Sequence, residues 1–229
     1  MIVTIIPAAG RSKRMVSPTS KQFMALDNMP VLAHTLKAFE QSKKVDQVIV
    51  VGNAKDLSYC RNHLFKKYDF KKVTHLIQGG RRRQDSVFKG LQALPPDTEY
   101  VVIHDGARPL VTPELIDKAI AEVKRSSAVV VGIPLKDTIK VATQDQVVEY
   151  TLDRPRLWAI QTPQVFKTEI LVRAHRQARA DKFWGTDDAS LVERMGNPVK
   201  VIMGSEENVK ITTPIDMVTA RAILMGRRG

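Results

Sequence analysis

Short apolar runs alternate with amphipathic stretches along this chain, and this alternation restricts its fold more than any other feature. The apolar runs are residues 3–8, 46–52, 73–80, 100–109, 128–135 and 198–204. Apolar residues fall at helical spacing between these runs, as in residues 30–42, and Thr112 and Thr213 each precede a proline where a helix should begin. Strands that are apolar throughout are typical of a parallel sheet covered by helices on both faces. The sequence therefore predicts one α/β domain over residues 1–229, doubly wound around a mostly parallel sheet.

One segment departs from this rhythm. Residues 136–158 show period-two patterning on either side of the polar residues 143–146, which predicts a two-stranded β-arm instead of a strand and helix. An isolated hairpin is only marginally stable in water. We therefore expect the arm to pack on its own domain or on a second subunit.

Composition excludes several classes of protein. With 43% hydrophobic and 26% charged residues, the chain has the balance of a globular protein, and 229 residues suffice for a sizeable core. It has neither a run near the roughly 18 apolar residues of a membrane helix nor a signal-peptide pattern, so we expect no membrane partner and a cytoplasmic location. The single cysteine, Cys60, excludes an internal disulfide framework, and neither it nor the five histidines form a metal-ligand spacing.

The charge balance by itself favours an ordinary solvated basic surface, but it is also compatible with an anionic partner. The formal net charge is +12, which suits either nucleic acid or small polyanions such as phosphates. Aromatic residues make up only 6% of the chain and are not interleaved with the basic clusters, which argues against a platform for single strands. We therefore expect no nucleic-acid partner, although a basic nucleic-acid-binding module stays open as the alternative of another class.

Polar or small residues follow four of the predicted strands. In an open α/β sheet, ligands bind at the carboxyl ends of the strands. Each of these stretches could be a simple turn, but four of them at one edge favour a ligand site. They are Ala8-Ala9-Gly10, Gly79-Gly80 with the residues up to Ser86, Asp105-Gly106-Ala107-Arg108, and the stretch around Lys210-Ile211-Thr212.

The loop after the first strand indicates phosphate chemistry. The small residues 8–10 allow backbone N–H groups to approach a phosphate closely. Neither the GxxxxGK[ST] nor the GxGxxG pattern is present. Arg14 and Lys21 supply cations instead, which suits a triphosphate whose transfer depends on positioning and charge neutralisation.

Asp105 follows an apolar strand and precedes Gly106. A carboxylate at a strand end beside a phosphate loop can bind Mg²⁺ or a ribose, although Asp-Gly is also a strong turn pair. His104, inside the strand, is better explained as a packed or hydrogen-bonded histidine than as a catalytic one.

Seven further motifs complete a family pattern. They are PAAGRSKRM with SKQF, GGRRRQDSV, VIHDGARP, DTIK, LDRPRLWAIQTPQVF, TDDASLVE and NVKITTP, in order along nearly the whole chain. This combination closely resembles the 2-C-methyl-D-erythritol 4-phosphate cytidylyltransferase family. A ribitol 5-phosphate cytidylyltransferase is the nearest alternative, and LDRPRLW favours methylerythritol phosphate.

The resemblance implies a Rossmann-like sheet with a β-arm that intertwines with a second subunit in a homodimer. It implies transfer of CMP from CTP to methylerythritol phosphate, with release of pyrophosphate and with Mg²⁺ as cofactor. The implied site residues are Ala8, Ala9 and Gly10 at the CTP phosphates; Arg14 and Lys21 at the α-phosphate; Gly80, Arg83 and Ser86 around the cytosine; Asp105, with Gly106 beside it, at the metal and ribose; and Thr138, Arg154 and Lys210 at methylerythritol phosphate, the first two from the neighbouring subunit, with Arg108 and Thr212 as lesser candidates.

The chain departs from the family pattern in three places. Ser12 replaces the second glycine of AAGxGxRM, so the backbone there must avoid glycine-only angles or accept strain. Gly106 replaces the alanine of HDAARP. Arg81 and Arg82 add charge near the expected base pocket.

Overall fold

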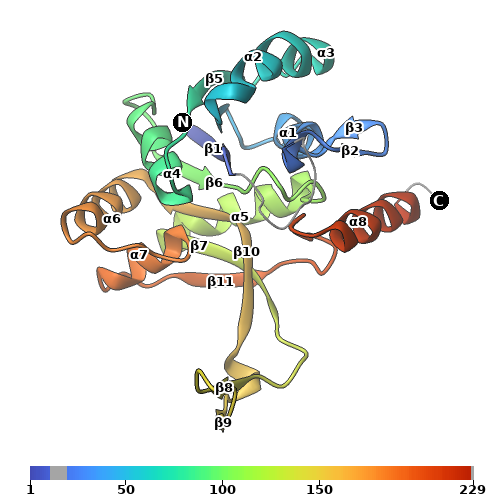
Figure 1. Ribbon diagram of the computed structural model, residues 1–229. Helices are drawn as coiled ribbons and strands as arrows, with labels where there is room; N and C mark the ends of the chain where they lie inside the picture. The colour runs from blue at the N-terminus through green and yellow to red at the C-terminus, as the bar shows by residue number, and fades with distance from the viewer. Residues whose placement is uncertain (11–19, 228–229) are drawn as a thin grey trace.

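A seven-stranded sheet forms the centre of the protein. The computed structural model describes residues 1–10 and 20–227, and Figure 1 shows the sheet between two layers of helices. Its strands, in spatial order, are β11 (Lys200–Met203), β7 (Ala128–Pro134), β10 (Trp158–Lys167), β6 (Tyr100–Ile103), β1 (Ile2–Ala8), β4 (Gln47–Gly52) and β5 (Val73–Gln78). Only β10 runs antiparallel to its neighbours, β6 and β7. The predicted mostly parallel α/β sheet is therefore confirmed.

Adjacent residues of each strand supply two separate cores. Ile6 packs in the core beneath α1 (Val31–Gln41) and α5 (Pro113–Ser126), whereas Ile5 packs in the core beneath α4 (Arg83–Gln92), α6 (Thr168–Ala180) and α7 (Asp188–Arg194). Successive side chains of a strand point to opposite faces, so continuous apolar runs serve both layers. The α1 and α5 layer also receives the buried, free Cys60 from a helical segment built of η2 (Ala54–Asp56), α2 (Leu57–Tyr59), η3 (Cys60–Phe65) and α3 (Lys66–Tyr68).

A smaller core holds the last helix, α8 (Pro214–Gly226), beside the short hairpin of β2 (Ala25–Leu26) and β3 (Met29–Pro30). Thr213 precedes this helix as predicted, and both its backbone N–H and its hydroxyl donate to the Asp216 carboxylate, at 2.7 and 3.0 Å. Thr112 caps α5 in turn, since its hydroxyl accepts from the backbone N–H of Leu115. Within the described ranges, no helix is both long and apolar enough to cross a membrane.

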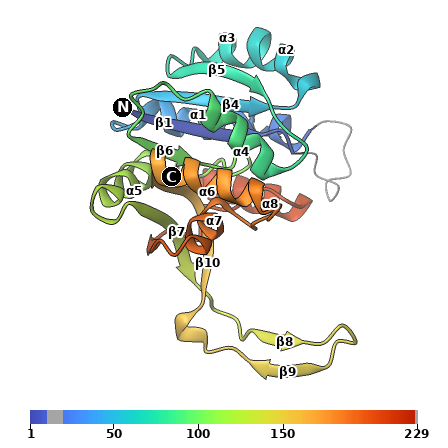
Figure 2. The same ribbon diagram turned by 90° about the vertical axis from the view of Figure 1, so that its left-hand side faces the viewer.

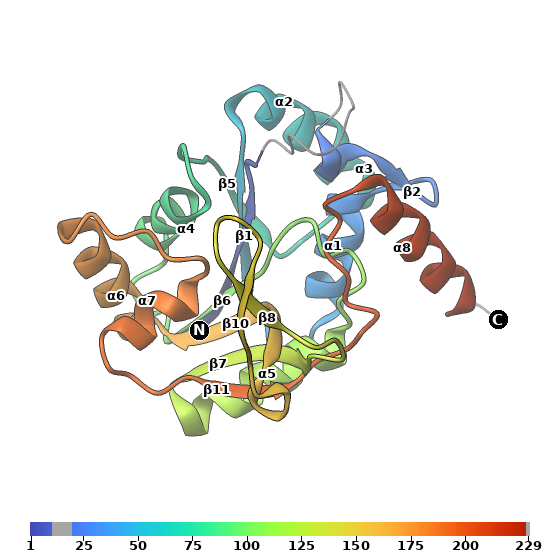
Figure 3. The same cartoon turned by 60° about the horizontal axis from the view of Figure 1, so that its bottom comes forward.

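The segment 136–158, called the arm below, stands apart from the sheet except at Trp158, where β10 begins (Figure 2). It contains the antiparallel strands β8 (Lys140–Ala142) and β9 (Val148–Thr151), followed by the short helix η4 (Arg154–Arg156). Val147, Val148 and Tyr150 are more than half exposed. Figure 3 brings the arm to the front and shows it reaching out from β7 and β10. Its role in dimerisation stays a prediction.

Strand β10 is the main element that the sequence did not predict, and α6 and α7 were not predicted either. Pro163 lies inside β10, and a proline within a run argues against a central strand. The sheet accommodates it with a register shift between Gln161 and Gln164, where pairing to β7 is interrupted. The interruption turns Thr162 toward the next strand, and its hydroxyl accepts from the backbone N–H of Asp105 at 3.1 Å.

Candidate active site

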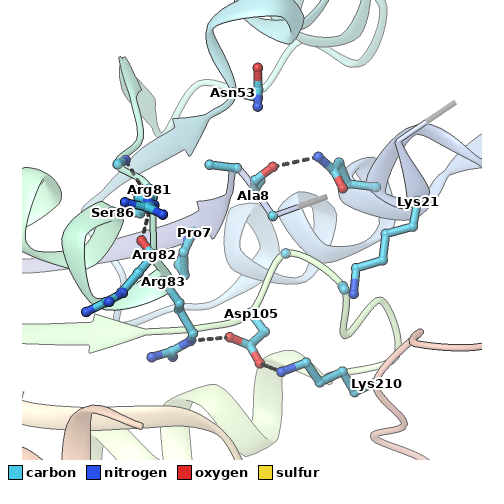
Figure 4. A pocket seen from close by; sticks show the side chains of 16 residues that line it. Pro7, Ala8, Lys21, Asn53, Arg81, Arg82, Arg83, Ser86, Asp105 and Lys210 are labelled. Atoms are coloured by element: carbon cyan, nitrogen blue, oxygen red, sulfur yellow. Dashed lines mark hydrogen bonds and ion pairs between the residues drawn. The ribbon is translucent and has the colours of Figure 1, made fainter. Parts of the chain in front are cut away.

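One pocket of about 460 Å³ opens where the parallel strands end (Figure 4). It brings together three of the four predicted strand ends and Lys210 from the fourth, so the expectation of a ligand site at this edge is met by a cavity. Its described lining is Pro7, Ala8, Ala9 and Gly10 after β1; Lys21 and Gln22 of η1 (Lys21–Phe23); Asn53; Gly80, Arg81, Arg82, Arg83 and Ser86; Asp105, Gly106 and Ala107; and Lys210.

Close backbone packing shapes the floor of this pocket. A Cβ atom at Gly79 would lie 2.6 Å from the Ala9 Cβ and 2.8 Å from the Ser86 Oγ, so only glycine lets the ends of β5 and β1 meet there. The backbone N–H of Gly80 donates to Ser86 Oγ at 3.1 Å, and this hydroxyl donates to the Arg82 carbonyl. The turn between β5 and α4 is thus held in one shape at the mouth of the pocket.

Asp105 lies between two cations. Its Oδ1 accepts from Arg83 Nε at 2.9 Å and its Oδ2 from Lys210 Nζ at 2.6 Å, as Figure 4 shows. Burial by itself would raise the pKa of this carboxyl, but the charges and hydrogen bonds of Arg83 and Lys210 outweigh it and hold the pKa of Asp105 well below its usual range. The carboxylate is therefore ionised and fixed in direction by both partners.

Lys21 and Lys210 approach the pocket from distant parts of the chain. The Lys21 Nζ donates to the carbonyl of Ile211 at 2.9 Å, although 190 positions separate the two residues. The backbone N–H of Ile211 donates to the carbonyl of Ala107 at 2.8 Å, which anchors the 208–212 stretch beside the end of β6. Both lysines line the same cavity as Asp105.

Two predicted residues lie next to the pocket and outside its lining. Arg108 donates from its Nη1 to the carbonyl of Asn208 at 2.7 Å, and its burial lowers its pKa. Thr212 donates both its backbone N–H and its hydroxyl to Asp216, at 2.8 and 2.6 Å, and so helps to begin α8. In this structure both side chains support the loops that carry Asp105 and Lys210.

Two predicted site residues, Thr138 and Arg154, lie away from the pocket. Thr138 and Arg154 belong to the arm and do not line the pocket, and Arg154 donates to the carbonyl of Lys136 at 2.9 Å. Arg14 lies outside the described residues, as does Ser12. His104 is fully buried and its Nε2 lies 3.2 Å from the carbonyl of Arg108, so it is the packed, hydrogen-bonded histidine that was expected.

Sequence reasoning missed several residues that shape the site. Gln22 is almost fully buried and donates to the carbonyl of Ala8 at 2.6 Å, which ties η1 to the end of β1. Arg82 was noted only as added charge near the base pocket, and the structure shows it stacked over the half-exposed Trp184, with its guanidinium carbon 3.6 Å from the ring centre. The motifs SKQF and TDDASLVE contained signals for Gln22 and for the buried Asp188, but spacing alone does not assign roles to them.

The charges of the pocket suit a polyanion. Lys21, Lys210 and residues 81–83 all line it, whereas Asp105 is the one carboxylate among its described lining residues. No group of three or more metal-ligating side chains occurs among the residues that the structure describes. Magnesium commonly takes one or two carboxylates together with substrate phosphates. A single ionised carboxylate among cations therefore fits an ion that is held mainly by a bound nucleotide.

Comparison with known proteins gives one consistent result. A family model described as 2-C-methyl-D-erythritol 4-phosphate cytidylyltransferase matches residues 2–226. A relative of that name from Pelotomaculum thermopropionicum is 44% identical over 100% of this chain and 96% of its own, and one from Caldanaerobacter subterraneus subsp. tengcongensis is 45% identical over 97% and 98%.

Solved structures agree with the sequence relatives. The 4-diphosphocytidyl-2C-methyl-D-erythritol synthase of Anaerococcus prevotii superposes with a TM-score of 0.87 at 32% identity, covering 98% of this chain and 96% of that one. The 2-C-methyl-D-erythritol 4-phosphate cytidylyltransferase of Thermus thermophilus gives a TM-score of 0.80 at 30% identity over 97% and 98%.

Proposed function

The chain belongs to the 2-C-methyl-D-erythritol 4-phosphate cytidylyltransferase family, and from this premise we propose how its pocket performs the reaction. The activity is transfer of CMP from CTP to 2-C-methyl-D-erythritol 4-phosphate in isoprenoid biosynthesis, with release of pyrophosphate. This identity is favoured over a ribitol 5-phosphate cytidylyltransferase and over a nucleic-acid-binding module. The observation that carries the assignment of roles is the cation-lined pocket around Asp105.

The triphosphate of CTP lies against Ala8, Ala9 and Gly10 in this proposal. Small residues leave room for the phosphate oxygens, and backbone N–H groups can face them. Lys21, with Arg14, stabilises the charge that develops on the α-phosphate, because in phosphoryl transfer most catalysis comes from positioning and electrostatic stabilisation. The base occupies the side formed by Gly80, Arg83 and Ser86, and Asp105 with Gly106 lies at the ribose.

The bond changes follow from the substrates. An oxygen of the methylerythritol 4-phosphate attacks the α-phosphorus of CTP, a new P–O bond forms there, and the bond to the β-phosphate oxygen breaks. The electron pair leaves with pyrophosphate. Lys210 faces the incoming phosphate, with Arg108 and Thr212 supporting its loop. Asp105 would hold Mg²⁺, which, when bound, neutralises phosphate charge.

The arm completes the proposed site from a second subunit. Thr138 and Arg154 lie on the arm, whereas Lys21 and Lys210 lie in the pocket. A hairpin with exposed Val147, Val148 and Tyr150 needs a partner to be stable. We therefore place Thr138 and Arg154 of one subunit at the methylerythritol phosphate bound by the other, in a two-fold homodimer.

Pyrophosphate release tests the activity directly. The protein is incubated with CTP, Mg²⁺ and either methylerythritol phosphate, ribitol 5-phosphate or no alcohol. We expect release with methylerythritol phosphate well above both other reactions. Equal or faster release with ribitol 5-phosphate would contradict the substrate assignment.

A further inference from the structure

A line of paired polar side chains, which ends at a histidine, runs from the pocket into the protein core. Lys210 Nζ binds Asp105 Oδ2 at 2.6 Å, and Asp105 Oδ1 binds Arg83 Nε at 2.9 Å. Arg83 Nη1 then binds Asp188 Oδ2 at 2.6 Å, and Asp188 Oδ1 lies 3.0 Å from His175 Nε2. The first three residues line the pocket, whereas Asp188 and His175 do not.

The inner members of this line are sealed from solvent. The Asp188 side chain is 1% exposed and that of His175 is 0% exposed, whereas Arg83 keeps 29% of its side chain accessible. A charged carboxylate is stable at such a depth only when it is paired and hydrogen-bonded. Arg83 and His175 together supply both oxygens of Asp188 with a partner, which explains why a charge is tolerated there.

Asp188 also fixes how Arg83 is turned. The guanidinium is planar and presents its N–H donors in a rigid fork, so binding at Nε and at Nη1 defines the direction of its plane. Asp105 follows β6, Asp188 begins α7 and Arg83 begins α4, so three separate elements meet at this one side chain. If Asp188 is lost, the guanidinium keeps a single carboxylate partner and can rotate about it.

We propose that Asp188 is a positioning residue for cytidylyl transfer, which orients Arg83 and thereby the Asp105 carboxylate at the floor of the pocket. His175 holds the second oxygen of Asp188 and sets its orientation. The inference rests on the proposed function, because it assigns Asp105 and Arg83 to the nucleotide. It adds a residue that the substrates do not touch.

The first test compares two neighbouring aspartates. Asp188→Asn removes the charge that Arg83 binds. Asp187→Asn makes the same chemical change one position earlier, where the side chain accepts from the backbone of Ser190 and from Gln164. Asparagine keeps the capping oxygen for Ser190 and gives up the bond from Gln164, which does not involve Arg83. We expect Asp188→Asn to lower kcat about 10- to 100-fold, as small displacements of catalytic groups do. Asp187→Asn should retain kcat within about twofold, the range expected when a cap is conserved.

Binding separates positioning from general damage. Asp188 does not line the pocket, so its loss displaces only Arg83 and Asp105 and leaves in place the groups assigned to the phosphates, which are Ala8, Ala9, Gly10 and Lys21. The dissociation constant of CTP, measured by calorimetry, should therefore change much less than kcat does. Parallel losses in kcat and in CTP affinity, or an unchanged kcat, would overturn the proposal.

A double variant covers the case in which Asp188→Asn does not fold. Arg83→Gln removes the cation alone, and the double variant Arg83→Gln with Asp188→Asn replaces the whole ion pair with neutral amides. If Asp188 acts through Arg83, adding Asp188→Asn to Arg83→Gln should lower kcat no further. A further tenfold loss would show independent action and refute the inference.

A spectroscopic signal keeps this test separate from the assigned activity. The side-chain Nε–H resonance of Arg83 reports its hydrogen bond to Asp105 without any substrate. It should shift in Asp188→Asn, or in His175→Phe if the former is unfolded, and stay in place in Asp187→Asn. A wild type that releases no pyrophosphate would refute the proposed function alone, whereas an unmoved Arg83 resonance would refute the positioning role.

Discussion

Mixing two inactive variants should restore about a quarter of the wild-type activity if the arm completes the partner's site, by random assortment of subunits. The two changes are Lys21→Ala, in the pocket, and Arg154→Ala, on the arm. Each homodimer then lacks one group in both of its sites. Loss of one group that stabilises developing charge costs about 10²–10³ in rate, so each parent should retain roughly 1% or less.

The expected recovery follows from the geometry of the arm. After denaturation, mixing one to one and refolding, about half of the dimers are mixed, and two-fold symmetry gives each of them one intact site. The signal therefore exceeds the parental background roughly 25-fold or more, taking the rate losses above. Pyrophosphate release with CTP and methylerythritol phosphate measures it.

A second mixture controls for recovery of activity after refolding. Wild type mixed with Lys21→Ala should give about half of the wild-type rate, whichever subunit supplies Arg154, since half of the pockets keep Lys21. If Arg154 acts on the pocket of its own chain, every site in the first mixture lacks Lys21 or Arg154. No recovery there, with the control mixture at one half and subunit exchange verified by mass, would refute the shared site.

Three further outcomes are expected. Lys21→Ala should lower kcat and kcat/KM together by about 10²–10³ with a modest change in CTP affinity, because its charge matters most in the transition state. Steady-state kinetics measure this, and weaker CTP binding at unchanged kcat would indicate ground-state binding instead. A cytosine site built on the Gly79–Gly80 turn should give a higher kcat/KM for CTP than for UTP, and a far higher one than for ATP, because a mismatched base leaves buried groups unpaired. A comparable kcat/KM for ATP would contradict this. Burial lowers the pKa of His104 to about 3, so the unfolded state takes up a proton at a higher pH than the folded state does. The free energy of unfolding should therefore fall as the pH drops from about 6.5 toward 3, by up to about 1.4 kcal/mol per pH unit. Urea titrations should show this slope flattened in His104→Gln, and an unchanged slope would remove His104 as its cause.

Local patterns in the sequence were sufficient for the class of fold. The apolar runs ending at Ala8 and Gly52 became the parallel strands β1 and β4, because a strand buried on both faces needs apolar residues at nearly every position. The run at 73–80 also became a parallel strand, β5, but at the edge of the sheet and partly exposed. The helix beginning after Thr112 was predictable from its cap and its apolar stripe. The small residues and cations after these strands also indicated a phosphate site at one edge.

Sequence patterns failed at strand β10 and at the inner half of the site. Pro163 argues against a central strand. Residues 158–167 are nevertheless a central strand, because they pair with β6 on one side and β7 on the other, with the pairing to β7 interrupted beside the proline. Nothing near Arg83 in the sequence points to Asp188, which is 105 positions away. Such a contact exists only after two helices have packed on the same face of the sheet.

The sequence by itself determined the residue types at the strand ends, and with them the small residues and the excess of cations that line the pocket at this edge. Only the tertiary structure decided which of these side chains meet. Asp105 binds Arg83 and Lys210 because the order of the strands and the packing of the helices, which no local pattern encodes, bring the end of β6, the start of α4 and the 208–212 stretch together. The spacing of apolar residues along the chain follows from the geometry of a single strand or helix. Contacts between distant residues depend instead on how the apolar faces of all the elements pack together, which is a property of the whole chain.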